Sequence, residues 1–430
     1  MRRHPVFNSI VLWILVGFVI VLWGLAGILL AVGAKSKEDP LKANTAAAVA
    51  GNSKFALELY AKLKSDPEVK KADGNLFFSP YSISTALAMT WAGAKGETEK
   101  QMAEVLQFSL PQERLHQVLG ALEKQLNTGG KERGYELSVA NALWGQKGYG
   151  FLKEFLTLTK KNYGAGLREV DFINPVEREK ARKTINGWVE KETKKKIKEL
   201  IQPGILNKLT TLVLTNAIYF KGDWAIEFDK KETRDAPFRI SADKEVTVPL
   251  MYQKGDFTYA QEDKLQILEL PYKGDDLSMV VLLPTEVDEL TELEKSLTPK
   301  ELNRWLTLLR KQEVHVYLPK FKMTTGPLEL SGILKSMGMK DAFSLPPIAD
   351  FSGMTGRKDL YISNVLHKAF VAVDEKGTEA AAATAVVMAR GGISHEPVFR
   401  ADHPFVFMIK DNRSGSVLFM GKVCNPAKQD

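Results

Sequence analysis

Apolar residues recur along this chain at two different periods, and the period changes about halfway. In the first half they return every three or four positions, which predicts amphipathic helices over residues 55–63, 82–92 and 151–163. In the second half, short β-branched or aromatic runs lie between Gly, Asp and Pro, which predicts strands. These runs cover residues 246–252, 257–260, 265–270, 278–283, 313–319, 370–373, 405–410 and 416–423.

Two further strands interrupt the helical half. Residues 136–144 alternate in polarity, and residues 209–220 form a nearly uncharged, β-branched run, which is typical of a strand buried on both faces. Helical spacing returns at residues 290–297 and 300–311. The sequence therefore predicts an α+β fold, with helices concentrated early and sheet late.

The N-terminal segment is a candidate membrane anchor. Residues 5–34 carry no charge, and residues 10–32 are mostly Ile, Leu, Val, Trp and Gly, long enough as a helix to cross a bilayer. Arg2 and Arg3 precede this run, which predicts that the rest of the chain is exported. A cleaved signal peptide is the alternative, because residues 31–34 resemble a small-residue cleavage site, and the chain would then be secreted.

Composition sets the expected domain boundaries. Residues 35–52 are rich in Lys, Ala, Ser, Asn and Asp without a sustained apolar face, which favours a short flexible tether. We therefore expect a signal-anchor or signal peptide at 1–34, a linker at 35–52 and a folded domain at 53–430.

Charge and motifs argue against several classes of function. The formal net charge of +7 is spread along the chain without the aromatic and basic clusters of nucleic-acid-binding proteins, so we expect no nucleic-acid partner. The single cysteine, Cys424, excludes an intrachain disulfide and is expected to be a small buried side chain. Common catalytic and phosphate-binding motifs are missing and the six histidines are scattered, so we expect neither an enzyme nor a bound metal or cofactor.

The most informative segment is the run EKGTEAAAATAVVMARGGIS at residues 375–394. Its alanines favour an exposed helix ending in a Gly-Gly cap, whereas a period of two favours a strand. In a strand, the even positions from 378 to 388 carry no charge, and the odd positions from 379 to 389 carry only Glu379. Such a strand meets little steric or desolvation cost when it enters an existing sheet.

A candidate bait for a protease follows this run directly. Arg390 precedes Gly391 and Gly392, and its side chain suits the acidic specificity pocket of a trypsin-like protease. An insertable strand and a bait are therefore adjacent in the sequence.

Other segments extend the pattern. They are NLFFSPYSIS at 75–84, NAIYFKGDW at 216–224, LPKF at 318–321, DFSG at 350–353, HKAF at 367–370, ADHPF at 401–405 and FMGKV at 419–423. These motifs and their order, from about residue 52 to Pro426, resemble the serpins, a family of serine protease inhibitors, and residues 375–383 resemble the hinge of inhibitory members. The resemblance implies the serpin fold, in which helices pack around three β-sheets and a reactive-centre loop is exposed.

The resemblance also implies an irreversible, suicide-substrate inhibitor that works as a monomer on a target serine protease. In serpins the protease forms an acyl-enzyme with the loop, and the freed hinge then enters the main sheet. Cleavage after Arg390 suits a trypsin-like target, whereas the family's spacing from Glu375 places the cut after Gly391. The implied hinge residues are Glu375, Gly377, Thr378, Glu379, Ala380, Ala381, Ala382 and Ala383.

Two further groups of residues are implied to control insertion. The shutter, where strands must separate, would comprise Ser79, Ser82, Asn216 and His367, and the breach, where insertion begins, would comprise Trp224, Lys320 and Glu375. For each of them, an ordinary buried polar contact or core aromatic is the alternative role.

Three other interpretations stay open. A non-inhibitory serpin acting as a carrier or chaperone would usually carry bulky, charged or proline residues in the hinge, which the small side chains here argue against. A secreted hydrolase is disfavoured by the missing nucleophile motif. The basic cluster from Lys191 to Lys198 is either a polyanion site or, as we favour, a solvated helix face.

Overall fold

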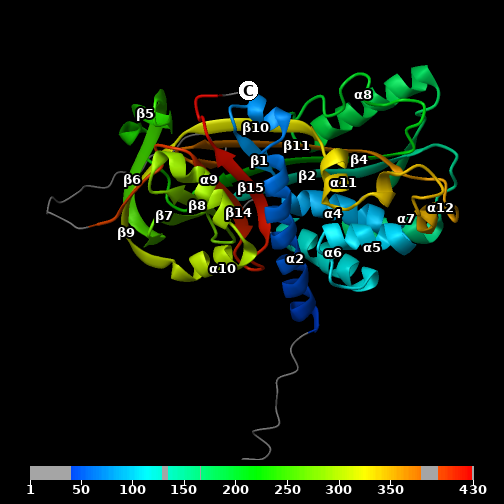
Figure 1. The fold of residues 1–430 in the computed structure, drawn as a ribbon, viewed down its shortest axis with the longest axis horizontal. Coiled ribbons are helices and arrows are strands. Elements are labelled where there is room, and N and C mark those ends of the chain that lie inside the picture. The colour runs from blue at the N-terminus through cyan, green and yellow to red at the C-terminus, as the bar shows by residue number, and fades with distance from the viewer. Residues whose placement is uncertain (1–39, 128–133, 165, 379–395, 429–430) are drawn as a thin grey trace, which may run out of the picture. The chain divides into compact units, whose positions relative to one another are not determined.

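The computed structural model describes residues 40–127, 134–164, 166–378 and 396–428 (Figure 1). Residues 45–430 form one compact unit, and residues 1–44 form another, of which only the start of one helix is described. The candidate anchor at 10–32, hinge residues 379–383 and the candidate cleavage site at Arg390 and Gly391 lie outside the described residues. Within the described ranges, no helix is both long and apolar enough to cross a bilayer.

Helices fill most of the first half of the described chain, as the apolar spacing predicts, and several begin at a capping side chain. The Ser79 Oγ accepts a hydrogen bond from the Ser82 N–H at 3.1 Å, and Asn174 caps another helix in the same way. The α-helices are α2 (Pro40–Leu63), α3 (Pro67–Lys71), α4 (Pro80–Trp91), α5 (Gly96–Val105), α6 (Gln112–Asn127), α7 (Lys153–Tyr163), α8 (Pro175–Glu192), α9 (Leu290–Ser296), α10 (Pro299–Leu308), α11 (Ser331–Met337) and α12 (Ser352–Thr355).

The described strands form two sheets. The larger has nine strands in the order β1-β15-β14-β8-β7-β6-β9-β13, with β5 paired to β6, and the smaller has six in the order β10-β11-β12-β4-β2-β3. Two of the three sheets that the resemblance implies are continuous here, because the N-terminal part of β6 pairs with β5 and its C-terminal part pairs with β7. The strands are β1 (Leu76–Phe78), β2 (Tyr135–Gln146), β3 (Leu167–Val170), β4 (Leu212–Asp223), β5 (Arg234–Ser241), β6 (Lys244–Glu262), β7 (Leu265–Pro271), β8 (Leu277–Pro284), β9 (Arg310–Pro319), β10 (Phe321–Glu329), β11 (Ile362–Asp374), β12 (Gly377–Thr378), β13 (Val398–Arg400), β14 (Phe405–Asp411) and β15 (Val417–Val423).

The six-stranded sheet is covered on both faces. In Figure 1 the strands β2, β4 and β11 run between α8 on one side and α4 to α7 on the other. Even-numbered residues of β4 pack in the cores shared with α4 and the larger sheet, whereas odd-numbered residues pack in a separate core with α8. The strand predicted at 209–220 is β4 at 212–223 and is buried on both faces as far as Phe220, whereas Leu209 is exposed.

Residues 40–52 of the expected tether at 35–52 are helical. Helix α2 begins at Pro40 and continues without a break to Leu63. The four alanines at positions 46, 47, 48 and 50 favour helix, and Val49 and Asn52 are buried. The Asn52 Nδ2 also donates a hydrogen bond to the Val417 carbonyl at 3.0 Å, so tertiary contact holds this segment.

Three of the differences from the sequence pattern arise because long-range pairing overrides local signals. The runs at 246–252 and 257–260 are one strand, β6, since Gly255 and Asp256 pair with β9 rather than forming a turn. The helix expected at 300–311 ends at Leu308, and β9 begins at Arg310. The run at 370–373 is only the end of β11.

The basic cluster from Lys191 to Lys198 does not form the solvated helix face that the sequence favours. Helix α8 ends at Glu192, and the chain then turns, with Lys194 and Lys195 in left-handed backbone conformations. The Thr193 hydroxyl closes this turn by accepting a hydrogen bond from the buried Ile197 N–H at 3.3 Å. Burying Ile197 against the sheet explains why the helix stops here.

Candidate functional site

The six-stranded sheet contains a split between β4 and β11. These strands are parallel neighbours from the Leu212–Ile362 pair to the Tyr219–Phe370 pair. Beyond that point they separate, and β12 lies between them, antiparallel to both. Thr378 pairs with Gly222 on one side and with Val373 on the other. A third strand has thus entered the top of the split, while the rest of the split is closed.

The space between β4 and β11 limits which side chains fit at the two residues of β12. Gly377 has φ of +155°, and a Cβ there would lie 1.9 Å from the Gly222 carbonyl oxygen, so only glycine fits. The Thr378 side chain is fully buried, and its hydroxyl bonds the Tyr272 hydroxyl at 2.8 Å. Burial raises the pKa of Tyr272, so this phenol stays neutral. Trp224 stacks on Tyr272 with the ring centroids 4.7 Å apart, so it supports the ring that contacts Thr378.

The breach residues implied by the resemblance meet at the turn that leads into β12. The Lys320 Nζ donates to both carboxylate oxygens of Glu375, at 3.1 and 2.9 Å, and the Thr233 hydroxyl donates to the same carboxylate at 2.9 Å. Burial raises the pKa of Glu375, but these hydrogen bonds outweigh it and hold the pKa below its usual value. The Trp224 indole N–H donates to the Asp374 carbonyl at 3.0 Å. This group therefore fixes the hairpin between β11 and β12.

We expect Lys320→Met to lower the free energy of unfolding by about 2 kcal/mol, because it leaves the buried Glu375 carboxylate without its cation. The loss stays moderate because the Lys320 side chain is 36% exposed. Urea unfolding measures the change. The matched control is the double variant Lys320→Met/Glu375→Gln, which removes the unpaired carboxylate charge and should recover more than half of the loss. If the loss in the double variant equals the sum of the losses in the two single variants, the two residues are not a coupled pair.

The shutter residues implied by the resemblance also lie in contact. The Ser79 N–H donates to the His367 Nε2 at 3.3 Å, which assigns the imidazole proton to Nδ1, and Nδ1 faces the Asn216 Oδ1. The Asn216 Nδ2 donates to the Ser82 Oγ at 2.7 Å. His367 lies on β11 and Asn216 on β4, where they are direct neighbours. This contact therefore joins the two strands that would have to separate.

Asn141 is a further member of this network that the sequence motifs do not include. Asn141 on β2 lies directly opposite Asn216, and its Oδ1 accepts hydrogen bonds from the Ser82 Oγ, at 3.1 Å, and from the Asn216 Nδ2. The Asn141 Nδ2 in turn donates to the Ser82 carbonyl at 3.3 Å. The available signal was an amide between two alanines, within the otherwise apolar stretch 139–145. A polar side chain at such a position needs a buried partner.

The shutter predicts a pH dependence. Burial lowers the pKa of His367 to about 3, whereas its pKa in the unfolded chain is about 6.5. Its contribution to stability is therefore complete above about pH 6.5 and is lost as the pH falls towards 3, by about 1.4 kcal/mol per pH unit. Burial also lowers the pKa of His116, to about 4, which adds loss with the same sign.

Urea midpoints at pH 7 and pH 5 measure this loss. We expect the difference between the two midpoints to shrink in His367→Gln, which has no titrating group, whatever its stability at pH 7. An unchanged difference would show that His367 does not carry the effect.

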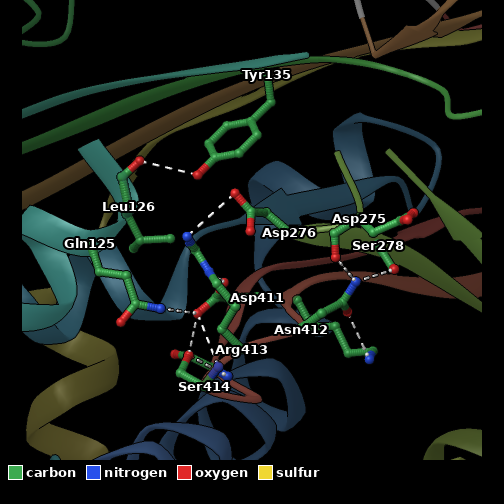
Figure 2. A network of polar contacts seen from close by, with 12 residues as sticks. Gln125, Leu126, Tyr135, Asp275, Asp276, Ser278, Asp411, Asn412, Arg413 and Ser414 are labelled. Atoms are coloured by element: carbon green, nitrogen blue, oxygen red, sulfur yellow. Dashed lines mark hydrogen bonds and ion pairs between the residues drawn. The ribbon is translucent and has the colours of Figure 1, made fainter. Parts of the chain in front are cut away.

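A second polar network lies at the turn between β14 and β15 (Figure 2). The buried Asp411 carboxylate accepts hydrogen bonds from the Arg413 Nε at 2.9 Å and from the Ser414 N–H at 3.2 Å, and Arg413 also pairs with Asp276 at 3.3 Å. Close by, the Tyr135 hydroxyl donates to the α6 carbonyl of Leu126 at 3.2 Å. These contacts fix the start of β2 and the turn between β7 and β8, which follows Tyr272.

The structure thus brings the predicted residues together in two places. The contact between Asn216 and His367 in the shutter and the pairing of Gly222 with Thr378 beside the breach lie along the same split, six residues apart on β4, which corresponds to about 20 Å of extended chain. Among the hinge residues, Glu375, Gly377 and Thr378 are described. This geometry can admit a strand at one end and must break the contact between His367 and Asn216 to admit it further.

Comparison with known proteins matches this geometry. The model of the family Serpin (serine protease inhibitor) matches residues 50–426. Leukocyte elastase inhibitor of Sus scrofa is 44% identical over 389 residues, covering 88% of this chain and 99% of that protein. The protein of the same name from Homo sapiens is 43% identical over 383 residues, covering 87% and 98%.

Two solved structures extend the similarity to the fold. Uncleaved ovalbumin gives a TM-score of 0.78 at 32% identity and covers 88% of this chain and 100% of its own. Human thyroxine-binding globulin complexed with thyroxine gives a TM-score of 0.79 at 34% identity and covers 89% of this chain and 99% of its own. With the ordered motifs and the split sheet, these similarities show that the chain belongs to the serpin family of serine protease inhibitors and is not an enzyme.

Proposed function

We propose that this serpin is an irreversible, suicide-substrate inhibitor, in which the cut hinge enters the split between β4 and β11. The observation that carries the proposal is the state of β12. Thr378 is already buried and paired with both neighbouring strands, so the first residues of an inserted strand are in register. Residues 380–386 are Ala, Thr and Val, which bring no charge into the sheet.

The register supports insertion as far as the shutter. Extending the pairing of Thr378 by six residues brings Thr384 opposite Asn216 and His367. The even-numbered hinge residues would then face the core with Thr378, and the inserted strand would replace the contact between the two shutter residues. Glu379, the only charge in the strand, would come opposite Lys221.

Hydrogen bonding supplies a driving force. Insertion replaces one parallel interface between β4 and β11 by two antiparallel interfaces, so the sheet gains about one interface of backbone hydrogen bonds. About ten such bonds, each contributing about 1 kcal/mol, give a gain on the order of 10 kcal/mol. A gain of this size can pull an acylated protease along and disturb its catalytic geometry, since a displacement of about 1 Å costs about a hundredfold in rate.

The proposal is tested by trapping and by heat. The intact domain is incubated with trypsin and run on a denaturing gel, where a covalent complex is the expected product. Separately, the loop is cut by a non-target protease, and the nicked form should melt at least about 20 °C above the intact form. Equal melting temperatures would overturn the proposal, and a carrier, as the name thyroxine-binding globulin describes, would give no complex.

For the target we propose a trypsin-like protease, with cleavage between Arg390 and Gly391. An acidic specificity pocket rewards a basic side chain strongly, which supports Arg390 over the cut after Gly391 that family spacing implies. A second candidate is an elastase-like protease, because the relatives are named leukocyte elastase inhibitors and Ala389 suits a small pocket. The mass of the released C-terminal peptide distinguishes the three cleavage sites.

We further propose that residues 10–32 anchor the domain on the extracytoplasmic side of a membrane, with a cleaved signal peptide as the alternative. The length of the uncharged run and the arginines before it support this location. Membrane fractionation with N-terminal sequencing tests it. An intact N-terminus in the membrane pellet is expected, whereas a soluble product that starts after about residue 34 would establish secretion.

A further inference from the structure

The turn that follows α8 is held on both sides of the split between β4 and β11. On the side of β4, the Lys194 ammonium pairs with the Glu136 carboxylate of β2, the strand next to β4. On the other side, the Lys368 Nζ of β11 donates to the Lys198 carbonyl oxygen at 2.9 Å. Residues 194–198 therefore form a strap that crosses the split.

Lys196, in the middle of the strap, contacts both strands that border the split. Its ammonium lies over the Tyr219 ring of β4 and the Phe370 ring of β11, 5.9 and 5.7 Å from the ring centroids. The two rings also contact each other, with their centroids 6.1 Å apart, and both are buried. Cation–π and aromatic contacts of this kind are attractive. This bridging contact of three side chains therefore joins β4 to β11 in addition to their backbone pairing.

The bridging contact lies directly ahead of β12. Tyr219 and Phe370 are the last direct pair of β4 and β11 before these strands separate. Extending the register of β12 by three residues from Thr378 brings Ala381 opposite both Tyr219 and Phe370. Residues that pair directly share a face of the sheet, so the Ala381 side chain would point to the same face as the two rings. The third residue to enter after Thr378 therefore has to separate this contact.

The bridging contact is incompatible with an inserted strand. Neighbouring strands lie about 4.8 Å apart, so a strand that enters between β4 and β11 moves the two rings apart by about this distance. The Lys196 ammonium can then stay over one ring at most, and the strap cannot keep its contacts on both sides of the split. The bridging contact therefore stabilises the closed split and not the inserted state.

We propose that Lys196 is a positioning residue that limits the rate of strand insertion, a role that rests on the proposed function. Its ammonium stabilises the closed split alone, so it raises the barrier that the hinge has to cross after Thr378. The turn fixes the Lys196 backbone, because the Lys196 N–H donates to the Thr193 carbonyl at 2.9 Å and the next residue, Ile197, is fully buried. This placement of the backbone brings the ammonium over the two rings.

Three variants isolate this role. Lys196→Met removes the charge and keeps a long apolar side chain, and folding should be kept because Lys196 is exposed. Lys196→Arg keeps a cation over the rings and should behave as the wild type. The matched control is Lys322→Met. The Lys322 ammonium also lies over the Phe370 ring, at 5.8 Å, but Lys322 is on β10, which pairs with β11 on the same side of the split.

Uptake of a labelled synthetic peptide with the sequence of residues 379–388 tests the role of Lys196 without a protease. Fluorescence of the label measures the rate at which the intact protein takes up the peptide. Loss of the cation should speed uptake by Lys196→Met about threefold, whereas Lys196→Arg and Lys322→Met should keep the wild-type rate. An unchanged rate in Lys196→Met, an equal acceleration in Lys322→Met, or no uptake by any of these proteins would overturn the proposal.

Covalent trapping measures the same step in the complete reaction. At saturating trypsin, the limiting rate constant of complex formation should rise about threefold in Lys196→Met. The trypsin concentration that gives half of this limit should not change, because the first encounter involves the loop and not the strap. Peptide uptake that depends on Lys196 without any covalent complex would refute the proposed function and keep the role of Lys196. Complex formation with equal limiting rates in Lys196→Met and the wild type would refute the role of Lys196 and keep the function.

Discussion

The variant Thr378→Arg is expected to be cut as an ordinary substrate, with no covalent complex on a denaturing gel. The wild-type Thr378 side chain is fully buried and bonded to the Tyr272 hydroxyl, beside Trp224. A guanidinium in that place would lose its hydration without a carboxylate partner, at a cost of several kcal/mol. Insertion then begins too slowly to compete with deacylation, so the protease is released after each cut.

The control for this prediction is Thr378→Ser, which keeps the hydroxyl and should still trap the protease. Because the new arginine is itself a site for trypsin, Thr378→Glu should be tested beside it and should give the same result. Mass spectrometry must show that the loop is still cut at the wild-type position. Retained covalent trapping in Thr378→Glu would contradict insertion through the split between β4 and β11.

The second large effect is expected for Arg390→Ala, which should lower the association rate constant with trypsin by about a thousandfold or more. Trypsin binds a basic side chain through a buried carboxylate in its specificity pocket. Leaving that carboxylate unpaired raises the activation free energy by about 4 kcal/mol. Progress curves at several inhibitor concentrations measure the constant. The melting temperature should not change.

Arg390→Lys is the matched control and should keep most of the trypsin inhibition. Elastase provides the opposite comparison, because its small pocket does not need Arg390. If Arg390→Ala still inhibits trypsin at the wild-type rate, the bait is another residue. If the wild type traps elastase alone, the elastase-like candidate replaces the trypsin-like one.

Most helices and strands followed from apolar spacing, and the exceptions share one cause. Residues 40–52 look like a tether until Asn52 is seen bonded to Val417 at the start of β15 and Val49 is seen buried. Strand β6 looks broken until Gly255 is seen paired with β9. Lys195 lies in a run that resembles a helix face, but burial of Ile197 ends the helix first. In each case a contact that is distant in sequence outweighs a local preference.

The candidate site was accessible from the sequence only in part. The shutter and breach residues were identified by resemblance, since nothing local says that His367 and Asn216, 151 residues apart, face each other. Asn141 was missed because it belongs to none of the recognised motifs, although it bonds two of the shutter residues.

The sequence by itself determined the chemistry of the insertable segment. It has small, nearly uncharged side chains on both faces and an arginine at its end, and these properties depend only on composition and on the period of two along a strand. It also determined which segments are helical or extended, because apolar periodicity is a local property.

Only the tertiary structure decided where that segment can go. Strands β4 and β11 are neighbours through pairing of distant segments, Thr378 is already seated between them, and Lys196 contacts Tyr219 and Phe370. Such pairings depend on which surfaces bury each other once the whole core forms. The pairing that forms is the one that minimises exposed apolar area and unpaired polar groups over the entire chain. It therefore cannot be deduced from any single stretch of residues.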